Sequence, residues 1–160
     1  MTQTETLAPV TVAKAEGEAL WFFGQLVEVK AKAADTGGAM SLLEVTAPPN
    51  LPGPLHVHHH EEEGFFILEG SATFQVGDQT IQARAGDYLL GPRDIPHKYD
   101  TGPDGCRMLW LMTPGGFEDM VREMGEQAKE RVVPPPATEP PDLERIARIA
   151  QKYGNELLER

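Results

Sequence analysis

Cysteine is almost absent from this chain, because Cys106 is the only one in 160 residues. No disulfide can form within the chain, which suits a reducing compartment, and we expect the protein in the cytoplasm. Long apolar runs are also missing. The first twenty residues hold no continuous apolar stretch of the kind found in signal peptides, and no segment reaches the ~20 apolar residues of a membrane helix. We therefore expect a soluble protein with no membrane partner.

Basic residues are scarce relative to acidic ones. Lysine and arginine total 14 and aspartate and glutamate total 25, so the formal net charge is −11. A chain this acidic is repelled by phosphate backbones and anionic lipid, which argues against nucleic acid as a partner. Solubility is the simplest role for this charge.

Glycine and proline, by contrast, are plentiful, with 16 and 14 residues. Both residue types favour turns, so we expect many short strands in preference to long helices. A length of 160 residues suits one domain with a buried core and some chain left over for a tail.

Short apolar or alternating segments separated by turns fill residues 19–114. In the clearest one, Ala72, Phe74 and Val76 alternate with polar residues, which is the period of a half-buried strand. Strands spaced in this way predict a β-sandwich or barrel. Residues 1–18 are polar and predict a loose N-terminal arm. The other predicted strands are 21–23, 26–29, 40–46, 63–68, 79–83, 86–90, 98–101 and 107–113.

Helical periodicity replaces the strand pattern in residues 115–160. Residues on one predicted helical face either pack in a core or, through their methionines, line a pocket: Phe117, Met120, Val121 and Met124. The proline-rich segment 134–141 predicts an extended linker, after which Asp142 can cap a last helix. The predicted apolar stripe of that helix consists of Leu143, Ile146, Ile149, Tyr153 and Leu157.

Four of the five histidines lie within five residues, and three glutamates follow them directly. Residues two apart on a strand face the same side, so His56 and His58 share one face. Glu63 begins the next strand, and a Gly/Pro loop lets a distant strand deliver His97. Imidazole and carboxylate together suit a divalent transition metal: iron, nickel, manganese, zinc, cobalt or copper, among which the sequence does not choose. The predicted metal ligands are His56, His58, Glu63 and His97.

The alternative interpretation is a set of solvated histidines beside an acidic run. The His-x-His pair, the downstream carboxylate and the third histidine behind a turn favour the metal site. His59 is expected to face solvent, whereas His60 has the strand parity of a ligand but lies where the strand ends. Arg93 and Lys98 flank His97 and either pair with a substrate carboxylate or lie on the surface.

The spacing of these residues resembles the two motifs of the cupin family. The first motif is Gly-x5-His-x-His-x3–4-Glu-x6-Gly, which the chain matches from His56 to Gly70, with Asn50 in place of the leading glycine. The second is Gly-x5-Pro-x-Gly-x2-His-x3-Asn, which begins at Gly86. Here Asp94 replaces the glycine and Thr101 the asparagine.

The resemblance covers residues 20–113 and implies a double-stranded β-helix, or jelly-roll barrel, with the metal inside. The 15 residues between Gly70 and Gly86 are typical of small single-domain bacterial cupins, and the chain is similar to the quercetin-dioxygenase-like members. The all-β barrel would then carry a C-terminal α-helical extension. The resemblance also implies a homodimer.

Two classes of function follow from the predicted site. As a metal-dependent dioxygenase, the protein would act on a small enolic or aromatic, flavonol-like substrate, and Glu63 would be both a ligand and the catalytic base that takes a substrate proton. As a non-catalytic module, it would use the metal to bind or sense a small molecule. A metal-dependent isomerase or decarboxylase is a third possibility, because this fold hosts several chemistries. Residues that form either pocket walls or plain core are Phe65, Phe66, Phe74, Tyr88, Trp110 and Met112.

Overall fold

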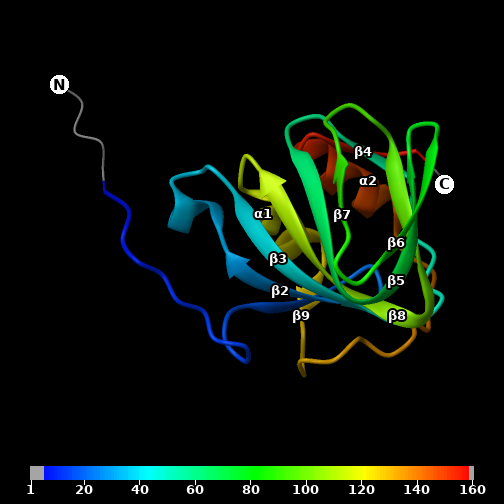
Figure 1. Cartoon of the computed structure of the whole chain (residues 1–160), viewed down its shortest axis with the longest axis horizontal. Coiled ribbons are helices and arrows are strands. Elements are labelled where there is room, and N and C mark those ends of the chain that lie inside the picture. Colours follow the sequence, from blue (N-terminus) through cyan, green and yellow to red (C-terminus); the bar gives the residue numbers. More distant parts are fainter. Residues whose placement is uncertain (1–5, 159–160) are drawn as a thin grey trace.

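The structure is a computed structural model that describes residues 6–158. The first five residues of the predicted N-terminal arm therefore lie outside the described residues. Residues 6–18 contain no helix or strand, and Figure 1 shows this segment extending away from the strands. Neither helix found in residues 6–158 has the length and apolar character needed to cross a bilayer.

Strands make up most of the regular structure of residues 6–158. Figure 1 shows them curving around a common interior, with the helices packed against the strands. The elements in chain order are β1 (Ala19–Phe22), β2 (Gln25–Ala31), a 3-10 helix (Ala33–Thr36), β3 (Ser41–Ala47), β4 (His56–His58), β5 (Glu62–Val76), β6 (Gln79–Arg84), β7 (Tyr88–Gly91), β8 (His97–Thr113), α1 (Phe117–Met124), β9 (Glu126–Gln127), α2 (Leu143–Lys152) and β10 (Asn155–Leu157).

The strand order explains how the sheet encloses an interior. Hydrogen bonding follows β10-β4-β8-β3-β2-β1-β9, while β5 pairs with β6, β7 and β8. The long strand β8 therefore contributes to both halves of the structure, since it pairs with β3 and β4 on one side and with β5 on the other.

The interior is packed by one face of each strand. In β3 every second residue is buried, and Leu43 and Val45 have no exposed surface. The alternation predicted in the sequence is present in β5, where Ala72 and Phe74 are buried and Gln75 is exposed. Burial of such side chains is the main stabilising contribution to a β-structure of this size.

The predicted strands 63–68 and 72–76 are joined into one long strand. β5 bends at Gly70, which has a φ of 74° and which packs so closely that an added Cβ would lie 2.0 Å from the Gly105 carbonyl oxygen. Glycine adopts this conformation without a steric penalty. β5 pairs with β8 on both sides of the bend. The predicted strands 98–101 and 107–113 are therefore also joined, as parts of β8.

The predicted last helix ends earlier than its apolar stripe suggested. α2 stops at Lys152, and Gly154 follows with a φ of 75°. A glycine in this conformation ends helices because residues with a Cβ rarely adopt it. Leu157 therefore belongs to β10 and not to a helix. Leu143 begins α2 but is about half exposed, so it is not part of a buried stripe.

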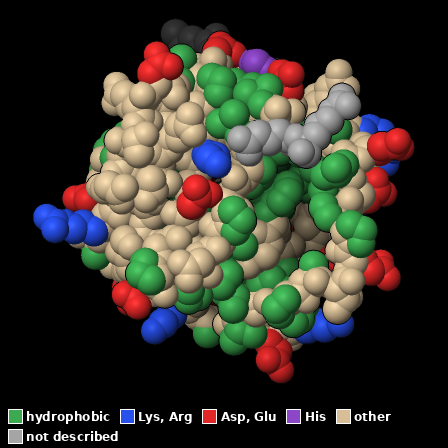
Figure 2. All heavy atoms as spheres, turned by 90° about the vertical axis from the view of Figure 1, so that its right-hand side faces the viewer, with side chains coloured by type: hydrophobic (Ala, Val, Ile, Leu, Met, Phe, Trp, Pro, Cys, Tyr) green, Lys and Arg blue, Asp and Glu red, His purple; other side chains and the backbone are tan. Residues whose placement is uncertain are grey.

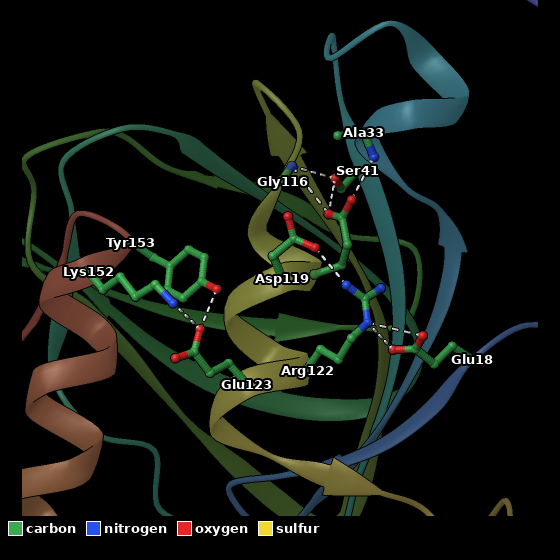
Figure 3. Close-up of polar contacts among 10 residues, drawn as sticks. Glu18, Ala33, Ser41, Gly116, Asp119, Arg122, Glu123, Lys152 and Tyr153 are labelled. Carbon is green, nitrogen blue, oxygen red and sulfur yellow. Dashed lines mark hydrogen bonds and ion pairs between the residues drawn. The ribbon is translucent and has the colours of Figure 1, made fainter.

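Polar contacts fix α1 against its neighbours (Figure 3). Arg122 donates from Nε to Glu18 Oε1 at 2.8 Å, which ties the helix to the chain just before β1. Glu123 Oε2 accepts from Lys152 Nζ at 2.8 Å and from the Tyr153 hydroxyl at 2.5 Å. The buried Glu118 carboxylate accepts from Ala33 N, Ser41 Oγ and Gly116 N. α1 and α2 are thus held as a pair beside the barrel.

Candidate metal centre

The four residues predicted as metal ligands come together in the structure. His56 and His97 lie directly opposite each other on β4 and β8, and Glu63 comes from the start of β5. One ligand atom from each of the four residues lies within 4.8 Å of every other. The group consists of His56, His58, Glu63 and His97.

One carboxylate oxygen is the centre of this group. Glu63 Oε2 lies 2.9 Å from His97 Nε2, 3.0 Å from His58 Nε2 and 3.8 Å from His56 Nε2. Glu63, His58 and His97 are almost completely buried, whereas the His56 side chain is 23% exposed. The site is therefore enclosed by protein except on the side of His56.

The second ring nitrogen of each histidine has its own partner. Nδ1 lies 2.9 Å from the Pro54 carbonyl in His56, and 3.1 Å from the Ile95 carbonyl in His97. A carbonyl oxygen can only accept, so these Nδ1 atoms carry a proton, and Nε2 is the ring nitrogen directed at Glu63. Such outer partners are typical of histidines that bind metals.

Glu61 is the outer partner of the His58 ring. Its Oε1 lies 2.8 Å from His58 Nδ1, and the Glu61 side chain is itself buried. The histidine cluster was predicted from the sequence, but this role of Glu61 was not. The run of three glutamates gave a signal, because a carboxylate three residues after a ligand histidine can reach back to its ring.

The pKa values show how strongly these groups interact in the absence of a cation. Burial opposes ionisation of Glu63, but hydrogen bonds from the three histidines outweigh it and hold the Glu63 pKa well below its usual range. Burial lowers the pKa of His56. The pKa of His58 is raised to about 9, because the neighbouring carboxylates of Glu61 and Glu63 outweigh its burial. An ionised carboxylate thus sits among three imidazoles.

This donor set fits a divalent transition metal. Three Nε2 atoms and a carboxylate oxygen converge on one place, and imidazole and carboxylate together are donors that suit such a cation. His58 Nε2 is buried and lacks a well-formed hydrogen bond although it lies 3.0 Å from Glu63 Oε2. A metal would satisfy that atom, and His56, His58, Glu63 and His97 are the residues that would hold it.

The other polar candidates lie outside the cluster. His59 is exposed and contacts Asp94 and Glu156 at the surface, as its strand parity predicted. The His60 ring is exposed and lies against Gly154. Arg93 pairs with Glu62 at 3.1 Å and Lys98 with Asp100 at 3.9 Å, so the structure supports the surface alternative for both.

Both departures from the cupin glycines are accommodated by the backbone. Asn50 has a φ of 56° and Asp94 a φ of 65°, so each adopts the left-handed conformation that a glycine would adopt there. Asparagine and aspartate tolerate this conformation better than other residues with a side chain. Thr101, at the asparagine position, donates to Pro48 O at 2.6 Å and accepts from Leu51 N at 2.8 Å.

A cavity opens beside the candidate metal ligands. The space within it and at its open mouth, which includes open solvent, is about 690 Å³, and His56, His58 and Glu63 are among its polar lining residues. Figure 2 shows one face of the molecule hollowed and lined there mostly by hydrophobic side chains. The main apolar walls of the cavity are Phe22, Tyr99, Trp110, Phe117, Met120 and Met124.

Only some of the residues proposed as pocket walls line the cavity in the structure. Trp110 lines the cavity, and so do both methionines of the α1 stripe. The other apolar candidates lie in the barrel core (Phe65, Phe74, Met112) or exposed on its outer surface (Phe66, Tyr88). Three lining residues, Asn155, Glu156 and Leu157, come from β10, and their place in the lining was not foreseen.

A barrel that encloses three imidazoles and a carboxylate is the structure of a class of metal-binding proteins. Comparison with known proteins indicates which family this class is. Residues 43–112 match the family model described as Cupin domain. The chain is 29% identical over 143 residues to quercetin 2,3-dioxygenase of Bacillus subtilis, covering 89% of this chain and 41% of that protein. It is 30% identical over 116 residues to quercetin 2,3-dioxygenase of Aspergillus japonicus, covering 66% of this chain and 32% of that protein.

The solved structures agree with this result at the level of the fold. An RmlC-like cupin from Shewanella frigidimarina superposes with a TM-score of 0.58 at 19% identity, covering 76% of this chain and all of that one. Residues 43–112 match the cupin domain, the chain is similar in sequence to the quercetin dioxygenases, and the predicted jelly-roll barrel with a C-terminal helix is confirmed. It spans less than half the length of the two quercetin dioxygenases.

Proposed function

We propose that this chain is a metal-dependent dioxygenase that acts on small enolic or aromatic substrates of the flavonol kind. The observation that carries the proposal is that three of the four candidate ligands, His56, His58 and Glu63, line a mainly apolar cavity. Similarity to quercetin 2,3-dioxygenase over 89% of the chain supports the same chemistry. The dioxygenase reaction places both atoms of O₂ in the product, so it needs no external reductant.

The residues of the chain have separable roles in this proposal. A bound divalent metal would supply Lewis acidity toward an enolic oxygen and a centre for electron exchange. Glu63 is ionised and lies at the cavity wall, so its carboxylate can take the proton of the substrate hydroxyl. Phe22, Trp110 and Phe117 offer aromatic faces to a flat substrate and exclude water from it.

Oxygen uptake tests the proposal. Protein loaded separately with iron, nickel or manganese is mixed with a panel of flavonols and other enolic compounds in an oxygen electrode. Uptake of one O₂ per substrate supports the proposal, and no uptake with any compound and metal rejects it. Ligand binding without uptake would indicate a binding or sensing module. Turnover that persists without oxygen would indicate an isomerase or a decarboxylase.

We also propose that the protein is a cytoplasmic homodimer. The support for a dimer is an apolar area on the outer surface of the barrel, where Phe66 pairs with Tyr88 across β5 and β7 and both side chains are exposed, as is Leu90. Apolar side chains gathered on a sheet face favour association. Light scattering on purified protein should give twice the mass of the chain, and a monomer would exclude the proposal.

A further inference from the structure

Among the four candidate ligands, only His56 is open to solvent. The side chains of His58, Glu63 and His97 are at most 4% exposed. The His56 side chain is 23% exposed. A molecule that approaches the metal position therefore has to pass His56, and the residues beside His56 decide which molecules can do so.

Leu157 lies directly beside His56. The strand β10 pairs antiparallel with β4, and Leu157 is opposite His56 in this register. Directly opposed residues of an antiparallel pair extend to the same face, with their Cβ atoms about 4.5–5.5 Å apart. The Leu157 side chain therefore lies at the exposed side of the candidate metal centre, which agrees with its place in the cavity lining.

A second hollow continues outward from the cavity. It is a more open groove, bordered by the end of the proline-rich segment and the start of α2, where Pro141, Leu143 and Ile146 line it. The cavity and the groove have part of their lining in common, so the common residues surround the passage between the two hollows. These residues include Phe23, Pro52, Pro54, Met124 and Leu157.

One side of this passage is rigid. The rings of Pro52 and Pro54 fix their own φ angles. Between them, Gly53 packs so closely on β8 that an added Cβ would lie 2.2 Å from the Tyr99 carbonyl oxygen. The Gly53 N–H also donates to Asp100 Oδ1 at 3.1 Å. Because this loop is held against β8, the width of the passage depends on the opposite side.

The opposite side consists of two flexible side chains. Met124 is the last residue of α1, and Leu157 belongs to the three-residue strand β10. Both side chains rotate about single bonds between staggered positions. Met124 is buried, whereas Leu157 is only partly buried, so packing restrains Leu157 less. Both residues lie outside residues 43–112, the part of the chain that matches the cupin domain.

We propose that Leu157 is the specificity-determining residue of the passage and that its side chain limits the size of the molecules that reach the metal centre. A small ion can pass this side chain, whereas a molecule with an aromatic ring has to displace it, because protein interiors are closely packed. This inference deepens the proposed function and rests on it for the bound metal. It does not depend on oxygen chemistry.

Ligands of two sizes test the passage. The full-length protein is loaded with cobalt, whose visible absorption changes when a further ligand binds, and is mixed in a stopped-flow instrument with azide or with 4-phenylimidazole. Leu157→Ala should raise the association rate of 4-phenylimidazole about tenfold, and Leu157→Phe should lower it about tenfold, as expected when a steric cost is removed or added. The association rate of azide should stay close to that of the wild type.

The two substitutions separate a size limit from a structural role. A defect in the packing of β10 would shift both variants in the same direction, whereas a size limit shifts them in opposite directions. Leu158→Ala is the matched control, because Leu158 is the next residue but is 41% exposed and does not line the cavity. It should bind both ligands at wild-type rates. The cobalt content of each variant is measured first, so that rates are compared for metal-loaded protein.

Several results would contradict the inference. Rates for 4-phenylimidazole that stay the same, or that shift in one direction in both variants, would reject Leu157 as the limiting residue. Equal changes for azide and 4-phenylimidazole would mean that Leu157 affects the metal centre itself. A wild-type protein that binds no cobalt or other metal would reject the inference and the proposed function together. Oxygen uptake without these rate differences would retain the proposed function and reject the inference, whereas size-dependent rates without uptake would do the reverse.

Discussion

Glu61 Oε1 lies 2.8 Å from His58 Nδ1, on the side of the ring that faces away from Glu63. The Glu61 carboxylate therefore fixes the orientation of the imidazole and keeps its other nitrogen directed at the candidate metal position. Because both side chains are buried, water does not replace this contact.

Removal of that carboxylate should weaken metal binding without unfolding the protein. In Glu61→Ala we expect metal affinity to fall about 10- to 100-fold, the usual effect of losing such an outer partner. Competition with a chromogenic chelator measures this change. Glu62→Ala is the matched control, since Glu62 pairs with Arg93 at the surface and should leave affinity unchanged. Equal affinity in both variants would show that Glu61 does not position His58.

The proposed base can be separated from its role as a ligand. Glu63→Gln retains an oxygen toward the metal position but cannot accept a proton, so more metal should remain bound than in Glu63→Ala. Turnover of any substrate found in the oxygen assay should fall about 10²- to 10⁴-fold, the range for loss of general-base catalysis. Steady-state rates normalised to metal content give the answer, and an unchanged rate would exclude Glu63 as the base.

Metal removal should lower the melting temperature. A ligand at 100 times its Kd stabilises the folded state by about 2.7 kcal/mol, which raises the Tm of a protein of this size by about 5–11 °C. Calorimetry on metal-loaded and chelator-treated protein should show this difference. His58→Ala should melt at the same temperature in both states, whereas His59→Ala, whose ring lies at the surface, should behave like the wild type. An equal Tm for metal-loaded and chelator-treated wild-type protein would contradict the assignment of the metal site.

The bend of β5 at Gly70 should be sensitive to a single methyl group. Gly70→Ala adds the strain of a positive φ to the overlap with the Gly105 carbonyl, and we expect a loss of about 2–5 kcal/mol in the free energy of unfolding. Gly86→Ala separates the two effects, because Gly86 has a φ of 93° but open space around its Cβ position. It should cost about 1–2 kcal/mol in urea unfolding. Equal losses would mean that the overlap relaxes freely.

The candidate ligands were predictable from the sequence because their spacing carries geometric information. His56 and His58 have the same strand parity, and the loop before His97 has room to turn. The pocket walls were less predictable. In the consecutive pair Phe65-Phe66 both residues are apolar, so alternation does not tell which one faces the core, and the structure buries Phe65 and exposes Phe66.

The contribution of the C-terminus was missed for a different reason. Leu157 continues the helical spacing of Ile146 and Ile149, so the pattern favoured a longer helix. Gly154 was the signal against it, because a glycine directly after a basic last turn is typical of a helix end. Pairing of β10 with β4 depends on tertiary contacts that no local pattern contains.

Anomalous diffraction at the absorption edge of the bound metal tests the central claim most directly. Crystals of protein purified without added metal should show one anomalous peak, about 2.0–2.2 Å from the Nε2 atoms of the three histidines and from a carboxylate oxygen of Glu63. No peak at that position after soaking in iron, nickel, manganese and zinc, or a peak bound by other residues, would contradict the account.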